Sequence, residues 1–237
     1  MHALILAAGD GGRLHPLTDG VPKPLLKLRG RPIINHVLDG LAACGVGEAT
    51  IVVGYYGDKI RTALENLHPC GMSLQFVENT AFDLGNARSI WAARDAMPRE
   101  GGFVLAMGDH LVEPALTAAL IAGAGGRCRL AIDRAAPGDP RAAEATRARV
   151  RDGRVVDLGK MLDDWNALDT GAFWCTPRVF DAITPALRDG EAGAVFAALA
   201  RAGELDAVDV TGRRWIDIDT ADDLRAAETL LLTEAHA

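Results

Sequence analysis

The feature that most constrains the fold is the alternation of short apolar runs with segments of helical periodicity in the first half of the chain. Residues 3–8 are continuously apolar and stop at Gly9, as expected for a strand buried on both faces of a parallel sheet. Apolar residues then recur at helical spacing between Ile33 and Leu41. The same alternation predicts strands over residues 49–53, 73–77 and 103–107 and helices over 59–67 and 87–96. This order predicts an α/β fold with a Rossmann-like, mostly parallel sheet flanked by helices, with ligands at the carboxyl ends of the strands.

The second half of the sequence has a different pattern. Alternating runs over residues 147–151 and 154–158 flank Asp152-Gly153, which predicts a small antiparallel hairpin element. Further strands are expected over residues 171–175 and 214–218, and helices over 177–187 and 192–202. Thr220 and Asp223 form the pattern of a capping box before a last amphipathic helix. Since no repeat or low-complexity linker divides the chain, residues 1–237 are expected to form a single domain.

Composition and charge argue against a disordered chain, a nucleic-acid-binding protein and a membrane protein. With 49% hydrophobic and 24% charged residues, the chain of 237 residues is expected to fold as a compact globular protein. Its net charge of -7 argues against a nucleic-acid partner, because such binding needs clustered Lys and Arg. The apolar run near Met1 is too short for a signal peptide or a membrane span, so we expect no membrane partner and a cytoplasmic location. Four widely spaced cysteines argue against a zinc site and a disulfide framework. The composition does not decide the oligomeric state, and a homodimer is possible.

The segment after the first apolar run indicates phosphate chemistry. Gly9, Gly11 and Gly12 let the backbone wrap closely around a phosphate chain and direct amide N–H groups at its oxygens. Arg13 adds a two-pronged donor, and Lys23, between two prolines, adds a compact positive charge. A Walker A loop and a dinucleotide-binding fingerprint starting at Gly9 would each need glycine at position 14, where a leucine stands. Both of those phosphate loops are therefore excluded.

The sequence L-A-A-G-D-G-G-R-L-H-P-L-T over residues 6–18, followed by P-K-P, resembles the opening signature of the sugar-phosphate nucleotidylyltransferases, L-A-A-G-x-G-[TS]-R-[LM]-x-P-L-T. Only Gly12 departs from it, because the family usually has Thr or Ser there. The resemblance implies the nucleotidyltransferase or GT-A type of fold, a nucleoside triphosphate and a small phosphorylated acceptor as partners, and Mg²⁺ as cofactor. It also implies nucleotide contacts at Leu6, Ala7, Ala8, Gly9, Gly11 and Gly12, with Arg13 as a catalytic residue.

Acidic residues after two expected strands are the candidates for a Mg²⁺ site. Asp109 comes just after the apolar run 103–107, at the sheet edge where a nucleotide would lie. Mg²⁺ takes about six oxygen ligands and is typically held by one or two carboxylates with phosphates and waters, so a second carboxylate is expected. Asp217 and Asp219 face the same side of an extended segment, and resemblance to the family's W-x-D motif favours Asp217. Asp109 and Asp219 can also be interpreted as helix caps.

Two further segments resemble the parts of the family that contact the nucleoside and the acceptor. The run over residues 78–90 is similar to the segment that borders base and ribose, with the candidates Glu78, Asn79, Gly85, Asn86 and Ser89. The alternative there is a plain loop followed by a capped helix. The hairpin, lysine and D-T-G pattern over residues 153–171 implies that Lys160 reaches the acceptor phosphate and that Asp169, Thr170 and Gly171 bind the acceptor. Lys160 can instead be a solvated surface charge, the commoner place of a lysine.

Together, G-D-H, G-N-x-x-S-I, D-G-R-V and W-x-x-x-D-T-G look most like the cytidylyltransferases that act on inositol 1-phosphate. Phosphocholine, phosphonate and sugar 1-phosphate nucleotidylyltransferases are the alternatives. The resemblance implies attack of an acceptor phosphate oxygen on the α-phosphorus of CTP, with release of pyrophosphate. Asp109 and Asp217 would hold Mg²⁺, Arg13 would stabilise the pyrophosphate, and Lys23 and Lys160 would offset negative charge.

Alternatives from other classes are weaker. A non-catalytic nucleotide-binding subunit is disfavoured by the presence of both cations, Arg13 and Lys23, together with the acidic candidates. A metal-dependent glycosyltransferase is disfavoured because Asp109-His-Leu111 lacks the D-x-D pair usual in that class. His15, His36 and His110 are interpreted as loop or packing residues, although His110, next to Asp109, is placed to bridge to a ligand.

Overall fold

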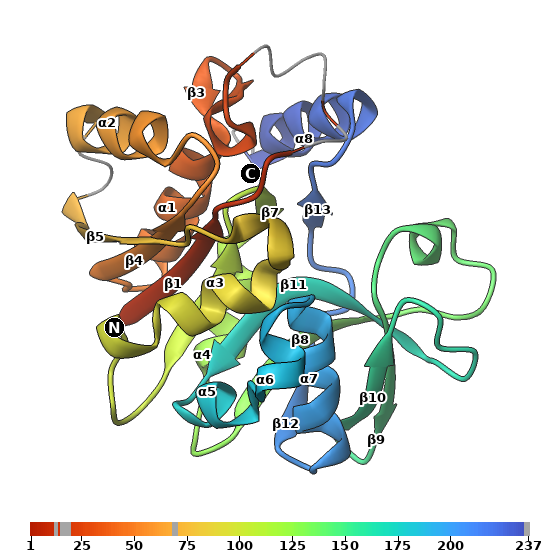
Figure 1. Ribbon diagram of the computed structural model, residues 1–237. Coiled ribbons are helices and arrows are strands. Elements are labelled where there is room, and N and C mark those ends of the chain that lie inside the picture. The colour runs from red at the N-terminus through yellow and green to blue at the C-terminus, as the bar shows by residue number, and fades with distance from the viewer. Residues whose placement is uncertain (12–13, 15–19, 68–70, 235–237) are drawn as a thin grey trace.

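The computed structural model describes residues 1–11, 14, 20–67 and 71–234 and has an α/β fold with one long sheet running through the molecule (Figure 1). Within these residues the order of the nine-stranded sheet is β5-β4-β1-β6-β11-β8-β12-β10-β9. Its strands are β1 (His2–Ala7), β4 (Glu48–Val53), β5 (Ser73–Glu78), β6 (Phe103–Met107), β8 (Cys128–Arg134), β9 (Arg147–Arg151), β10 (Arg154–Gly159), β11 (Ala167–Cys175) and β12 (Leu205–Asp209). Two small sheets pair β2 (Lys27–Leu28) with β3 (Arg31–Pro32) and β7 (His110–Val112) with β13 (Trp215–Asp217). The α/β class is confirmed.

The first half of the chain builds a parallel sheet, as predicted. β4 and β6 both pair in parallel with β1, and β5 pairs in parallel with β4. Its helices are α1 (Ile33–Ala43), α2 (Gly57–Leu67) and α3 (Asn86–Ala92). Side chains of β1 alternate between two cores, because Leu4 and Leu6 pack with α3 whereas Ala3 and Ile5 pack with α1 and α2. Both faces of β1 are therefore buried, which explains its continuously apolar sequence.

The prediction of a mostly parallel sheet is wrong for the second half, and the sheet is mixed. β11 joins β6 in the antiparallel direction and also pairs with both β8 and β9. Further pairs join β8 to β12, β12 to β10 and β10 to β9, so β11, β8, β12, β10 and β9 close into a ring. The predicted hairpin β9–β10 is present, and its two strands are part of the nine-stranded sheet. Its alternating pattern buries Ala148, Val150 and Val155 in the shared core, and this burial draws the hairpin into the ring.

The helices of the second half are α4 (Pro114–Ile121), α5 (Arg178–Ala182), α6 (Pro185–Arg188), α7 (Ala192–Arg201) and α8 (Ala221–Glu234). The helix predicted over residues 177–187 is two short helices, because Pro185 has no amide hydrogen and disfavours helical backbone at Thr184. α7 packs on the ring through Phe196, whose side chain stacks on Phe173 of β11 with 3.8 Å between ring centroids. Short 3-10 turns complete the fold at η2 (Lys23–Leu25), η4 (Phe82–Leu84), η5 (Arg94–Ala96) and η6 (Pro140–Ala143).

The predicted capping box at the start of α8 is confirmed. The Thr220 amide donates to the Asp223 carboxylate at 2.7 Å, and the Asp223 amide donates to the Thr220 hydroxyl at 3.2 Å. This reciprocal pair satisfies amide groups that the first turn of a helix leaves without partners. No helix in the part of the chain that the structure describes is both long and apolar enough to cross a membrane. Because β11 pairs with β6 of the parallel half and is also a strand of the ring, we propose that the chain forms a single domain.

Candidate active site

The candidate site begins where β6 ends beside β1. The Gly108 amide donates to the Leu6 carbonyl at 2.8 Å, which holds the chain after β6 against β1. A Cβ on Gly108 would come within 3.1 Å of that carbonyl oxygen and of the Ala7 side chain, so a glycine allows this close approach. Asp109 follows directly and lies at the carboxyl end of the parallel half of the sheet.

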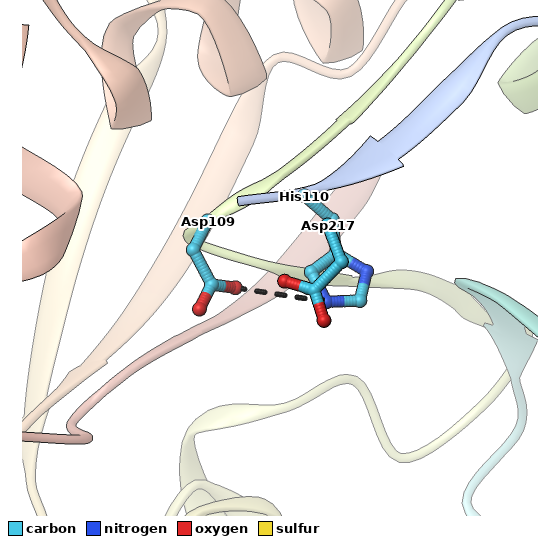
Figure 2. A group of neighbouring side chains, drawn as sticks. All are labelled: Asp109, His110 and Asp217. Atoms are coloured by element: carbon cyan, nitrogen blue, oxygen red, sulfur yellow. Dashed lines mark ion pairs between the residues drawn. The ribbon is translucent and has the colours of Figure 1, made fainter. Parts of the chain in front are cut away.

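The β7–β13 pair brings further carboxylates to Asp109. His110 lies opposite Asp217 in the antiparallel register, and the Ile218 amide donates to the Asp109 carbonyl at 3.2 Å. Figure 2 shows Asp109, His110 and Asp217 with their side chains gathered together, and ligand atoms of all three lie within 4.8 Å of one another. The pairing of β7 with β13, which are far apart in the sequence, thus brings together Asp109 and Asp217, two of the residues predicted to hold Mg²⁺.

Lys23 lies among these carboxylates. It begins η2, and only 6% of it is exposed. Its ammonium is 2.7 Å from Asp109, 2.7 Å from Asp219 and 3.8 Å from Asp217. Burial alone lowers the pKa of Lys23, but the charges of Asp109 and Asp217 and the hydrogen bonds outweigh burial and raise the pKa. The ammonium therefore stays charged at neutral pH and offsets the negative charge of the cluster.

His110 also lies in the cluster, although the sequence led to its interpretation as a loop or packing residue. Its Nε2 lies 3.1 Å from Asp217 and 3.8 Å from Asp109. Burial alone lowers the pKa of His110, but the charges of Asp217 and Asp109 outweigh burial and raise the pKa from 6.5 to about 9. Adjacency to Asp109 was the one sequence signal for this residue. Its pairing with Asp217 depends on the β7–β13 register, which periodicity does not encode.

The donor set of the cluster fits a divalent cation. Asp109, Asp217 and Asp219 offer carboxylate oxygens, the ligands that Mg²⁺ prefers. The ammonium of Lys23 already contacts two of these carboxylates at 2.7 Å, so this place accepts positive charge. Asp109 and Asp217 offer carboxylate oxygens that lie within 4.8 Å of each other and of a ring nitrogen of His110. The ammonium of Lys23 is bound to Asp109 and to Asp219.

The glycine loop is described in part. Gly11 has a φ of +65° and a Cβ there would lie 2.9 Å from Cβ of Lys23, so glycine permits the loop to approach Lys23 closely. The Ala8 carbonyl accepts a hydrogen bond from the Tyr55 amide at 3.0 Å. The predicted nucleotide contacts Leu6, Ala7 and Ala8 are buried, and Gly9 has open space where a Cβ would stand. Gly12 and Arg13 lie outside the described residues.

The predicted nucleobase segment over residues 78–90 includes the start of α3 and contacts the start of α7. Asn79 and Ser89 are buried and joined to each other, with Nδ2 donating to Oγ at 3.0 Å. The Asn86 side-chain oxygen accepts from the Ala192 amide at 2.5 Å, at the start of α7. A Cβ on Gly85 would overlap the backbone of Gly190, and Glu78 is exposed at the end of β5. These contacts fix the shape of the segment, and its contact with a nucleotide stays a prediction.

The predicted acceptor residues fall into two groups. Asp169, Thr170 and Gly171 lie on β11 where its pairing with β8 is irregular, and Asp169 accepts the Gly171 amide at 2.7 Å. Burial raises the pKa of Asp169 to about 6, against the opposing effects of the Gly171 amide and the His110 charge. Thr170 is buried, and its hydroxyl donates to the Ala131 carbonyl at 2.9 Å. Lys160 is exposed just after β10, whereas Gly171 lies against the ring of His110.

Comparison with known proteins gives a family match and relatives over nearly the whole chain. Residues 3–202 match the family described as MobA-like NTP transferase domain. The bifunctional IPC transferase and DIPP synthase of Rubrobacter xylanophilus is 34% identical over 97% of this chain and 52% of its own length. The protein of the same name from Archaeoglobus fulgidus is 34% identical over 99% of this chain and 44% of its own length. The chain thus spans about half the length of these curated relatives.

A solved structure that aligns with nearly the whole chain supports the fold. The inositol-1-phosphate CTP transferase from T. maritima matches with a TM-score of 0.86 at 26% identity, covering 97% of this chain and 94% of that chain. UDP-glucose pyrophosphorylase bound to UDP-glucose matches with a TM-score of 0.82 at 17% identity, which shows the fold alone. The parallel half and the ring therefore belong to an architecture that this chain shares with these structures.

Proposed function

The chain belongs to the MobA-like NTP transferase domain family, and on this premise we propose that it joins CTP to inositol 1-phosphate and releases pyrophosphate. The observation that carries the proposal is the convergence of Lys23 with Asp109, Asp217 and Asp219 at the carboxyl end of the parallel half. The names of the relatives that align with nearly all of this chain support CTP and inositol 1-phosphate as the substrates.

The acidic residues hold the metal in this proposal. Asp109 and Asp217 bind Mg²⁺, which supplies positive charge next to the phosphates of the nucleotide when it is bound. Lys23 keeps a charged ammonium beside the same carboxylates and offsets the negative charge of the triphosphate. The amides of the glycine loop and the guanidinium of Arg13 bind the pyrophosphate portion.

The reaction needs no protein base. An oxygen of the acceptor phosphate attacks the α-phosphorus of CTP, and the bond from that phosphorus to its bridging oxygen breaks. Pyrophosphate leaves with the electron pair of the broken bond. Because the second pKa of a phosphate monoester is about 6, the attacking phosphate is already largely deprotonated at neutral pH. The task of the protein is to place the two substrates and to stabilise charge.

The acceptor binds on the side of β11 and the loop after β10 in this proposal. Lys160, which is exposed, contacts the acceptor phosphate. The segment Asp169 to Gly171 forms the wall next to the acidic cluster and binds acceptor hydroxyls. This arrangement places the acceptor between the ring and the nucleotide-binding end of the parallel half.

A matrix of pyrophosphate-release assays tests the proposal. CTP, UTP, ATP and GTP are each combined with inositol 1-phosphate, phosphocholine, 2-aminoethylphosphonate and glucose 1-phosphate, and the Asp109→Asn variant serves as the inactive control. We expect pyrophosphate release with CTP and inositol 1-phosphate to exceed every other combination. Faster release with another acceptor would show that inositol 1-phosphate is not the preferred acceptor. A lack of pyrophosphate release in every combination would point to a non-catalytic nucleotide-binding subunit.

A further inference from the structure

His110 lies between the acidic cluster and the acceptor strand. On one side its Nε2 is 3.1 Å from the Asp217 carboxylate, across the β7–β13 pair. On the other side its ring rests against the backbone of Gly171 in β11, where a Cβ would overlap Nδ1. One side chain therefore contacts both a proposed metal ligand and the segment proposed to bind the acceptor.

The Gly171 side of the ring is held by packing. Nδ1 of His110 is buried and has no hydrogen-bond partner among the residues that the structure describes. The ring also borders a small cavity of about 20 Å³, which Thr117 and Val112 help to line. Since a hydrogen bond does not fix this edge of the ring, its place depends on the backbone that it touches.

The backbone at Gly171 is itself fixed in an unusual conformation. Its φ is +76°, in the left-handed region that favours glycine, and it lies within the irregular part of the β11–β8 pairing. The Asp169 side chain holds the Gly171 amide at 2.7 Å. A ligand that contacts Asp169 therefore acts on the same short piece of backbone that the His110 ring rests on.

We infer that His110 is a positioning residue through which the β11 backbone at Gly171 sets the place of the Asp217 carboxylate, so that the acceptor strand and the divalent-ion site are coupled. The part of this inference that concerns the acceptor rests on the proposed function. The link from Gly171 through His110 to the ion does not depend on any substrate. Residues that orient metal ligands typically change metal affinity by about 10- to 100-fold when they are substituted.

A double-mutant cycle with Mn²⁺ alone tests the substrate-independent link. Mn²⁺ affinity is measured from the electron paramagnetic resonance signal of the free ion, in the native chain, Gly171→Ala, His110→Ala and the double variant. We expect Gly171→Ala to weaken Mn²⁺ binding by about tenfold when His110 is present and by less than about twofold when it is absent. Equal weakening in both backgrounds, or none in the native background, would overturn the inference.

A matched glycine controls for backbone strain. Gly212 has a φ of +85° and nothing within 4 Å of a Cβ built on it, so Gly212→Ala adds the same kind of strain without touching His110. We expect this variant to bind Mn²⁺ within about twofold of the native chain. Circular dichroism of each variant checks folding, and His110→Asn takes the place of His110→Ala in the cycle if the alanine variant is unfolded.

The coupling to the acceptor is measured separately. We expect saturating inositol 1-phosphate to change the Mn²⁺ dissociation constant by at least about fivefold in the native chain, and by less than about twofold in His110→Asn. The same change in both proteins would contradict the coupling. Calorimetry shows directly whether inositol 1-phosphate binds at all. If it does not, the proposed acceptor is wrong, while the Mn²⁺ cycle without acceptor still decides the role of His110.

Discussion

Lys23 and Asp219 form an ion pair of 2.7 Å between two segments at opposite ends of the sequence. Lys23 follows the glycine loop, and Asp219 immediately precedes the capping box of α8. The same ammonium lies 2.7 Å from Asp109 after β6, so three separate parts of the chain meet at one charge. The cluster therefore contributes to the cohesion of the fold as well as to the proposed chemistry.

The Asp109→Asn variant should keep the fold and lose turnover. The substitution removes one negative charge from the proposed Mg²⁺ site but leaves the Lys23–Asp219 pair in place. We expect pyrophosphate release to fall by at least about 100-fold, comparable with the loss of a main electrostatic stabiliser. Asp163→Asn, at an exposed carboxylate outside the cluster, is the matched control and should stay within about twofold of the native rate. Near-native turnover of Asp109→Asn would remove this residue from the metal site.

The Lys23→Met variant should depend on a divalent ion for its stability. Without the ammonium, the carboxylates of Asp109 and Asp219 lose the cation that each contacts at 2.7 Å. We expect the free energy of unfolding to drop by roughly 2 kcal/mol or more in the absence of divalent ions. Added Mg²⁺ should then stabilise the variant more than it stabilises the native chain, because an ion bound only to the folded state shifts unfolding by mass action.

Urea unfolding with and without Mg²⁺ measures both effects of Lys23→Met. Lys27→Met, at an exposed lysine of β2, controls for loss of a surface charge. Equal stabilisation of Lys23→Met and the native chain by Mg²⁺ would show that Lys23 does not occupy the same electrostatic site as the ion.

Stability should depend on pH through Asp169. Burial raises the pKa of this carboxyl from 3.8 to about 6, so the folded state binds more protons than the unfolded state between these values. The contribution of Asp169 to the stability of the native chain therefore falls as pH rises across that window, and Asp169→Asn lacks this loss. Relative to the native chain, the variant should gain on the order of 1–2 kcal/mol between pH 4 and pH 7, measured by urea unfolding. Parallel stability curves for the two proteins would refute a raised pKa at Asp169.

The Lys160→Ala variant should weaken acceptor binding and leave stability unchanged. Lys160 is exposed, so its loss removes little packing. Loss of one charge-assisted contact to a phosphate should raise the KM for inositol 1-phosphate by about tenfold or more, with the KM for CTP nearly constant. Steady-state kinetics with each substrate varied in turn measures the difference, and Lys27→Ala is the control. An unchanged KM for the acceptor would leave Lys160 as a solvated surface charge.

The parallel half of the fold was predictable because burial on both faces leaves a simple signal. The predicted strand over residues 103–107 coincides with β6. The strand over 147–151, which coincides with β9 of the ring, was predicted from the alternating pattern of a hairpin instead. Periodicity does not encode the direction of a strand in the sheet, so the antiparallel junction at β11 and the closed ring were missed. β8 and β12 were also missed, because neither sequence has a clean apolar pattern. β8 includes the buried carboxylate of Asp133, and β12 has the sequence LDAVD, in which two of the five residues are aspartates.

The candidate site was predictable where one short segment carries the signal. Asp109 and Asp217 stand in such segments, and the structure brings them together with Lys23. The contacts of His110 with Gly171, and of Asn86 with the start of α7, join segments that are far apart in the sequence. These contacts depend on how helices and strands pack against one another, and the spacing of residues within one segment does not predict that packing.

The closed ring also determines how the long sheet ends. β9 is the last strand in the order but pairs with both β10 and β11, so in the described part of the chain the sheet ends there without a free hydrogen-bonding edge. β5 is the opposite edge, and it exposes Ser73, Gln75 and Glu78. Polar and charged side chains on an edge strand discourage uncontrolled pairing with other chains. Addition of a strand from another molecule to this nine-stranded sheet is therefore expected at β5, which among the described residues pairs with a strand on one side only.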